Sequence, residues 1–184
     1  MKYYFLFLML ALLQGEAFSR PSQVMIIRHA EKPQHGTHLN LKGQERAACL
    51  APFFIGTEKL NRSGMPVAIY ARAATKETPS LRPIETVAPL AKSLGISILS
   101  GYGGKDLVPM TREILSNPDY ENKLVLICWD HHGIPAIARL LGANQAPEKW
   151  YKSVFDRVWI LTFKGHEVEF EDMPERLLFG DSEE

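Results

Sequence analysis

Three short runs of apolar, largely β-branched residues constrain the fold of this chain more than any other feature. They span residues 24–27, 67–71 and 124–129. A strand that is apolar on both faces is typical of a parallel sheet covered by helices on both sides. Segments with helix signals separate the three runs. The sequence therefore predicts an α/β fold, a three-layer α/β/α sandwich around a mostly parallel sheet.

Signals at segment ends place the expected helices. Asn40 is typical of an N-cap for a helix over residues 41–54, and Pro52 predicts a kink or an early end of that helix. Pro83 opens another helix, which should stop before Gly95. The other expected elements are a strand at 96–99, helices near 108–115 and 134–141, and an antiparallel pair at 158–163 and 168–170.

The first 19 residues form a segment of a different kind. Lys2 precedes an apolar run over residues 3–13, and small residues follow at the spacing of a cleavage site. The run is short for a membrane span, so residues 1–19 predict a signal peptide and residues 20–184 a single mature domain. We expect a secreted or periplasmic protein without stable membrane insertion after cleavage. An uncleaved anchor or a buried N-terminal helix is the alternative.

The charge balance excludes one class of partner. The chain has 21 basic and 21 acidic residues, hence no net charge. It therefore lacks the overall positive electrostatic field that would attract nucleic acid. Any site for an anion must be a local cluster.

Basic residues follow each of the three apolar runs. Arg28 and His29 follow the first, Arg82 lies beyond a loop after the second, and His131 and His132 follow the third. The carboxyl ends of parallel strands lie at one sheet edge, so we expect these side chains to converge there. Arginine binds phosphoryl oxygens through its fork, and an imidazole among cations can attack phosphorus. The sequence predicts a site for a small phosphorylated molecule, although strands that simply meet solvent also end in charged residues.

Four motifs in order resemble the histidine phosphatase superfamily, in its phosphoglycerate-mutase-like branch. Residues 28–33 resemble the Arg-His-Gly signature, with Ala30 in place of the usual glycine. Residues 39–47 resemble the Leu-Thr-x-x-Gly helix start. The other two motifs, at 69–86 and 125–131, resemble the arginine-bearing helix with its strand and the strand of the second histidine. Together they cover most of residues 23–142.

The resemblance implies a phosphoric monoester hydrolase that works through a phosphohistidine on His29, without a cofactor or a metal. It implies that Arg28, Arg82, His29 and His131 bind the phosphate, and that His131 is the second catalytic histidine. His132 is the alternative for that role. Water would then hydrolyse the phosphohistidine.

The acid that protonates the leaving group is harder to identify. Many members of the superfamily carry a glutamate after the third strand, in an acidic motif that residues 101–106 lack. Asp106 is the expected acid, with Asp130 and Glu31 as alternatives. Without a positioned acid, alkyl phosphates should suffer more than aryl phosphates or anhydrides. A non-catalytic protein that binds a phosphorylated ligand is therefore the alternative function.

Overall fold

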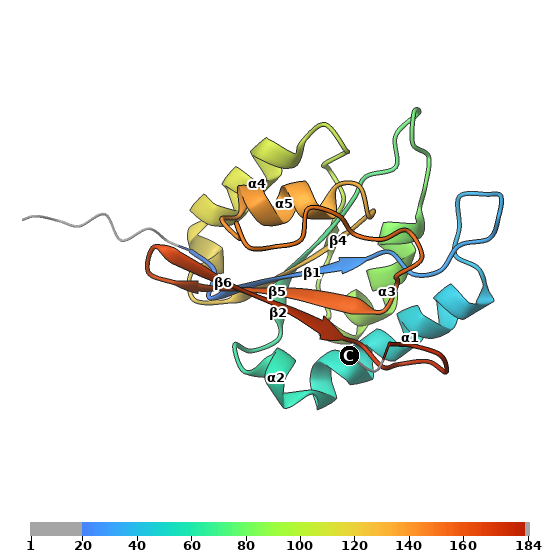
Figure 1. Cartoon of the computed structure of the whole chain (residues 1–184), viewed down its shortest axis with the longest axis horizontal. Coiled ribbons are helices and arrows are strands. Elements are labelled where there is room, and N and C mark those ends of the chain that lie inside the picture. The colour runs from blue at the N-terminus through green and yellow to red at the C-terminus, as the bar shows by residue number, and fades with distance from the viewer. Residues whose placement is uncertain (1–19, 183–184) are drawn as a thin grey trace, which may run out of the picture.

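The computed structural model describes residues 20–182, and the predicted signal peptide lies outside that part. Its centre is a six-stranded sheet in the order β3-β2-β4-β1-β5-β6 (Figure 1). β1 to β4 are parallel, and β5 and β6 complete the sheet as an antiparallel pair beside β1. The strands are β1 (Gln23–Arg28), β2 (Pro66–Ala71), β3 (Ile98–Leu99), β4 (Leu124–Trp129), β5 (Arg157–Lys164) and β6 (Glu167–Pro174). The predicted mostly parallel sheet is confirmed.

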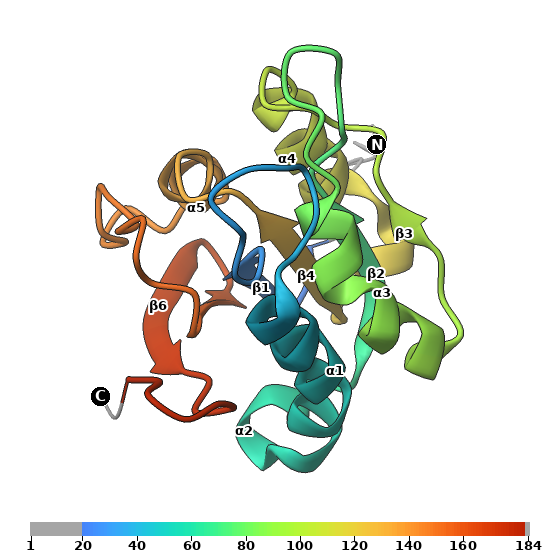
Figure 2. The same cartoon turned by 90° about the vertical axis from the view of Figure 1, so that its right-hand side faces the viewer.

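Helices cover both faces of the sheet (Figures 1 and 2). They are α1 (Leu41–Gly56), α2 (Glu58–Asn61), α3 (Arg82–Leu94), α4 (Leu107–Ser116) and α5 (Ile134–Leu140), with a 3-10 turn at Pro118–Tyr120. Alternate residues of β1 face opposite layers. Val24 and Ile26 pack with α4 and α5, whereas Met25 and Ile27 pack with α1 and α3. The result is the expected three-layer sandwich.

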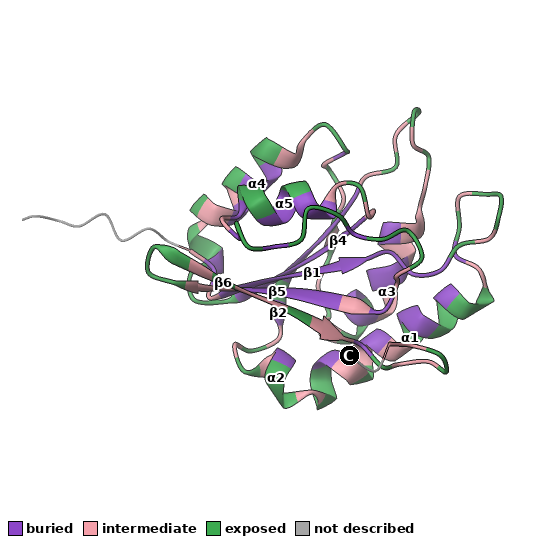
Figure 3. Ribbon diagram, viewed as in Figure 1, coloured by how far each residue is buried: buried purple, intermediate pink, exposed green. Residues whose placement is uncertain are grey.

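Complete burial distinguishes the middle of the sheet. Every residue of β1 and β4 is buried (Figure 3). Both faces of these strands are therefore covered, as their unbroken apolar runs predicted. Polar side chains can reach a ligand only where these strands end. Within residues 20–182 no helix is long and apolar enough to cross a membrane.

The helix boundaries follow local chemistry with two differences from expectation. The side chain of Asn40 accepts a hydrogen bond of 2.8 Å from Gly43 N, so the predicted N-cap of α1 is confirmed. The prediction that Pro52 ends or kinks this helix is wrong about the end, because α1 continues to Gly56. Proline removes a single hydrogen bond here, near the last turn, and its ring is exposed. The connection after α1, where the sequence predicted no helix, contains the short helix α2.

Candidate active site

A cavity of about 390 Å³ lies where β1, β2 and β4 end. Pairing in register brings Arg28 of β1 opposite Trp129 of β4, and Ala71 of β2 opposite Cys128. The residues that follow these strands therefore meet at one edge of the sheet. The cavity is lined by residues from these strand ends, from the loop before α3 and from the start of α3. Of the predicted phosphate-site residues, Arg28, His29, Arg82 and His131 all line it.

His29 is held in one orientation. Its side chain is buried, and its Nδ1 lies 2.8 Å from the carbonyl oxygen of Ala30. A carbonyl oxygen can only accept, so Nδ1 must carry the proton and Nε2 the lone pair. Burial, with the charges of Arg28 and Arg82, lowers the pKa of His29 to about 4 against the opposing effect of the Ala30 hydrogen bond. At neutral pH His29 is an uncharged imidazole with a free Nε2 lone pair.

The backbone beside His29 is fixed from both sides. His29 N donates to the carbonyl oxygen of Trp129 at 2.9 Å, which extends the pairing of β1 with β4. Ala30 N donates to Thr86 Oγ1 of α3 at 2.9 Å, and that hydroxyl donates to the Arg82 carbonyl oxygen at 2.7 Å. The strand end that carries His29 is therefore tied to the helix that carries Arg82.

Arg28 is almost completely buried, with 1% of its surface exposed. Its Nη1 donates to the carbonyl oxygens of Lys152 at 2.7 Å and Val154 at 2.8 Å, and its guanidinium lies 3.8 Å from the centre of the Phe155 ring. These contacts stabilise the charge through hydrogen bonds and a cation–π interaction. They also leave Nε without a partner in the protein.

Buried polar atoms without hydrogen-bond partners gather around the cavity. Among residues 20–182 they include Arg28 Nε, Ser80 Oγ and His131 Nδ1, all from residues that line it. Leaving a buried polar atom unpaired costs about 1–3 kcal/mol, so native structures rarely accumulate such atoms without a reason. A guanidinium N–H and a hydroxyl both donate readily to oxygen. The cavity is therefore suited to an oxyanion with several acceptor atoms.

His131 and His132 lie side by side, with ring centres 3.9 Å apart, and both line the cavity. His131 is partly buried, whereas His132 is exposed. Burial and the charge of Arg28 together lower the pKa of His131 to about 4. A neutral His131 can donate one N–H and accept at its other nitrogen.

Arg72 also lines the cavity, although it was not among the residues predicted for the site. It follows β2 directly and is buried, with its Nε 3.0 Å from Asp130 Oδ2. The angle of this contact is not that of a hydrogen bond, so the pair is held by charge. One signal was available in the sequence: Arg72 follows its apolar run as closely as Arg28 follows its own.

Arg82 reaches the cavity from the start of α3. Its Nη2 donates to the Gly36 carbonyl oxygen, and its Nε donates to that of His38 at 3.2 Å. Leu81 N donates to the Thr37 carbonyl oxygen at 3.0 Å. The loop over residues 34–38 is therefore fastened to the N-terminus of α3, and it forms one wall of the cavity.

The structure does not bring every candidate acid to the cavity. Asp106 lies outside its lining, and its carboxylate accepts from Gly103 N at 2.8 Å. Glu31 points into α1 and binds Arg46 with both oxygens, at 3.0 and 2.7 Å. Asp130 lines the cavity, but its oxygens are shared among Arg72 and the backbone N–H groups of His132 and Gly133. Among residues 20–182 no group of three or more His, Cys, Asp or Glu side chains is arranged to hold a metal ion.

Comparisons with known proteins locate this architecture among solved structures. The chain matches no family model and no curated protein. The putative phosphohistidine phosphatase SixA from Agrobacterium tumefaciens is similar at a TM-score of 0.56 and 17% identity, over 84% of this chain and 99% of that one. A putative alpha-ribazole-5'-P phosphatase from Escherichia coli is similar at 0.55 and 11% identity, over 84% and 97%.

A third similar structure is a phosphoserine phosphatase mutant from Entamoeba histolytica in complex with phosphoserine. It has a TM-score of 0.54 and 13% identity, over 85% of this chain and 99% of that one. The matches agree in covering most of both chains. The architecture predicted from the motif order is thereby confirmed, and the chain has the histidine phosphatase fold of the phosphoglycerate-mutase-like branch.

Proposed function

We propose that this chain is an exported phosphatase that hydrolyses phosphomonoesters or related phosphoryl groups through a phosphohistidine on His29. The observation that carries the proposal is the state of His29. Its Nδ1 is committed to the Ala30 carbonyl oxygen, and its lowered pKa of about 4 keeps Nε2 unprotonated at neutral pH. A neutral imidazole with one free lone pair is what attack on phosphorus requires.

The neighbouring cations supply the electrostatic part of this mechanism. Arg28, Arg72 and Arg82 line the same cavity as His29, so their charges act on the phosphoryl oxygens. Fixed cations beside those oxygens stabilise the negative charge that they carry while the bond to Nε2 forms. His131 can add one hydrogen bond from its neutral ring. The P–O bond to the leaving group breaks as the bond to Nε2 forms, and its electron pair stays on the leaving oxygen. Water then attacks the phosphorus, the P–N bond breaks with its electron pair returning to Nε2, and one proton of the water passes to solvent.

Two features of similar proteins support a phosphorylated ligand. A SixA structure with a TM-score of 0.54 and 15% identity holds tungstate, a tetrahedral oxyanion, and the Entamoeba histolytica enzyme holds phosphoserine. The unpaired buried donors of this chain match the same ligand chemistry. We propose that the ligand here is likewise a small phosphorylated molecule.

A second candidate is a protein that binds such a ligand without turnover. One observation favours it: Asp130 is the only carboxylate among the described residues that line the cavity, and Arg72 and two backbone amides already hold it. A phosphatase that acts on alkyl esters would need a proton donor there. A phosphatase whose leaving groups depart as stable anions would not need such a proton donor.

Hydrolysis of an aryl phosphate by residues 20–184, with EDTA present, tests the proposal. We expect turnover by the unchanged protein, loss of at least about a thousandfold in His29→Ala, and no loss in His166→Ala, whose histidine is exposed and outside the cavity. Acid quenching should trap phosphate on the unchanged protein but not on His29→Ala. Phosphate binding by an inert unchanged protein would overturn the catalytic proposal in favour of the binding protein.

The proposed export rests on residues 1–19, outside the described part of the chain. The N-terminal sequence of the protein recovered from the periplasm or the medium checks it. The chain should begin at Phe18 or Arg20, and a full-length chain retained in the membrane would contradict export.

A further inference from the structure

A second cavity, of about 490 Å³, lies beside the first. His131 and His132 line both cavities, so the two cavities adjoin at these rings. Its other wall is the segment over residues 148–153, which connects α5 to β5. This segment had no role in the sequence analysis.

The backbone of that segment is fixed relative to the first cavity. Arg28 holds the carbonyl oxygens of Lys152 and Val154, and Trp150 Nε1 donates to the Val154 carbonyl oxygen at 2.9 Å. Trp150 itself is buried against Trp159, with ring centres 4.9 Å apart. The same arginine that lines the first cavity thus positions the wall of the second.

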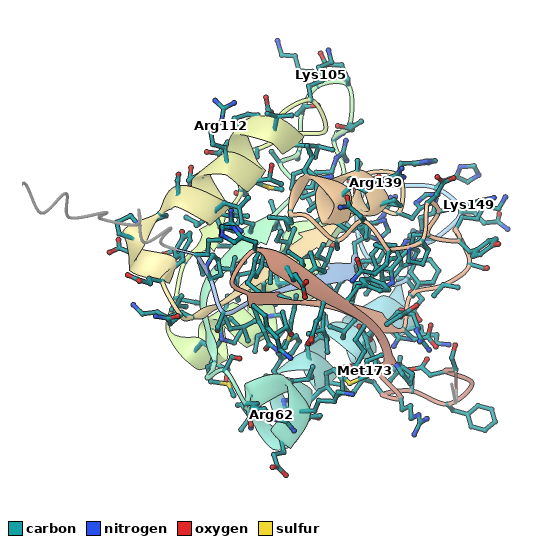
Figure 4. All side chains as sticks on the ribbon, turned by 60° about the vertical axis from the view of Figure 1, so that its left-hand side comes forward. Arg62, Lys105, Arg112, Arg139, Lys149 and Met173 are labelled. Carbon is teal, nitrogen blue, oxygen red and sulfur yellow. The ribbon has the colours of Figure 1, made fainter. Side chains whose placement is uncertain are left out.

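The side chains on this wall are free to meet a ligand. Lys149, Tyr151 and Lys152 are exposed, and Lys149 Nζ lies 5.1 Å above the Tyr151 ring. Figure 4 shows Lys149 at the periphery of the molecule, far from Lys105. The two ammonium groups can bind an anionic group of the substrate, and the aromatic face can contact the part of the substrate that is attached to that group.

The net positive charge of the residues that line the two cavities is greater than the negative charge of one phosphoryl group. Among residues 20–182, six basic side chains and two carboxylates line these cavities, whereas the total charge of the chain is zero. The basic residues are Arg28, Lys32, Arg72, Arg82, Lys149 and Lys152, and the acidic ones are Asp130 and Glu148. A phosphoryl group carries up to about two negative charges at neutral pH. The remaining positive charge calls for a second anionic group on the substrate.

The lack of a free carboxylic acid restricts the leaving group in a second, independent way. Asp130, the only carboxylate among the described residues of the first cavity, is bound to Arg72 and to backbone N–H groups. An alkoxide would leave slowly without a proton. A phosphate, whose second pKa is about 6, leaves as a stable anion.

Both restrictions are met by one substrate class. We propose that the enzyme removes the terminal phosphate of a diphosphate, with the inner phosphate bound by Lys149 and Lys152 in the second cavity. This inference rests on the proposed phosphohistidine activity and specifies its substrate. His29 Nε2 forms a bond to the terminal phosphorus while the bridging P–O bond breaks, and that electron pair leaves on the inner phosphate. Water then attacks the phosphorus, the P–N bond breaks with its electron pair returning to His29 Nε2, and one proton of the water passes to solvent as inorganic phosphate leaves.

Four probes separate the parts of this inference: methyl diphosphate, methyl phosphate, propanediol bisphosphate and an aryl phosphate. We expect kcat/KM for methyl diphosphate to exceed that for methyl phosphate by more than about a hundredfold. The bisphosphate has a second anion but an alkoxide leaving group, so it should fall in between. The double variant Lys149→Gln with Lys152→Gln should lower kcat/KM for the diphosphate about tenfold, mainly through KM, and lower it less for the aryl phosphate.

Lys105→Gln is the matched control, because this exposed lysine lies outside both cavities. It should leave the ratio of the two kcat/KM values unchanged. Aryl phosphate turnover together with no preference for the diphosphate, or with equal effects of the lysine variants on both substrates, would overturn the inference and leave the phosphatase intact. A bisphosphate that matches the diphosphate would also overturn the anhydride assignment. Failure of His29-dependent turnover of every probe would instead defeat the proposed function itself.

Discussion

The protonation of His29 is the residue-scale feature on which the chemistry depends. Burial lowers its pKa from 6.5 to about 4, and the charges of Arg28 and Arg82 act in the same direction. The charged imidazolium is thus disfavoured, and Nε2 keeps its lone pair down to about the folded pKa. We expect the rate of phosphohistidine formation to be insensitive to His29 protonation above about pH 5, and to fall as the pH drops through about 4.

An NMR titration of the His29 ring in the unliganded protein measures this directly. Its midpoint should lie near 4, and the acid limb of the single-turnover rate should coincide with it. The lowered pKa of His29 also makes the stability of the fold depend on pH. The unfolded chain binds more protons between about pH 4 and 6.5, so stability is complete above this window and decreases as the pH falls through it. A midpoint near 6.5 would show that His29 is not desolvated as described.

Individual residues differ in how far the sequence could place them. Arg28 and His29 follow an unbroken apolar run that is typical of a buried parallel strand, so their position where that strand ends could be predicted from the sequence. Arg72 was missed although it directly follows its apolar run, and its partner Asp130, 58 positions further along the chain, could not be identified from the sequence. Asp106 was expected as the acid, but it bonds to Gly103 in its own turn, as short acidic side chains in turns commonly do.

At the scale of elements, the close approach of α1 to the segment after His29 requires a glycine. Gly43 lies in the first turn of α1, and a Cβ there would meet the Glu31 carbonyl oxygen at 2.3 Å. That clash is with backbone, so it cannot be relieved by a rotamer change. We expect Gly43→Ala to destabilise the fold by about 1–3 kcal/mol, even though alanine favours helix more than glycine does.

Gly56, in the same helix, provides the matched control. A Cβ at this position meets nothing within 4 Å. Gly56→Ala should therefore leave stability unchanged or raise it by up to about 1 kcal/mol. Urea unfolding of both variants compares them directly. Equal stability changes at the two positions would mean that α1 does not pack on Glu31 in the way described.

Helices and strands were predicted well where the pattern of apolar residues and the residues typical of element ends indicate the same range. The strands β1, β2 and β4 and the helices α1 and α3 match their expected ranges to within about two residues. Strand β6 runs to Pro174, beyond the expected residue 170, because it gains its hydrogen bonds by pairing with β5 along its whole length. Pairing of that kind depends on a partner strand, and the composition of the segment itself does not reveal it.

At the scale of the whole molecule, Arg46 joins the region of the candidate site to the C-terminal segment. Its side chain, 2% exposed, binds Glu31 after β1, Glu175 after β6 and Asp181 beyond it. One arginine cannot balance three carboxylates, and burial raises the pKa of Glu175 to about 8. The partners lie up to 135 positions from Arg46, so no local pattern in the sequence predicts this cluster.

Removal of the Arg46 guanidinium should show how much this cluster contributes to the free energy of unfolding. Arg46→Met leaves two buried carboxylates and Asp181 without their partner, and we expect a loss of about 3–5 kcal/mol in the free energy of unfolding by urea. Lys59→Met, which breaks the exposed pair with Glu171, should cost less than about 1 kcal/mol. Because Glu31 follows His29 by two residues, Arg46→Met should also reduce phosphohistidine formation at temperatures where the variant is still folded. Equal costs for the two variants would show that the C-terminal segment is not held through Arg46, and the tie between this segment and the candidate site would have to be abandoned.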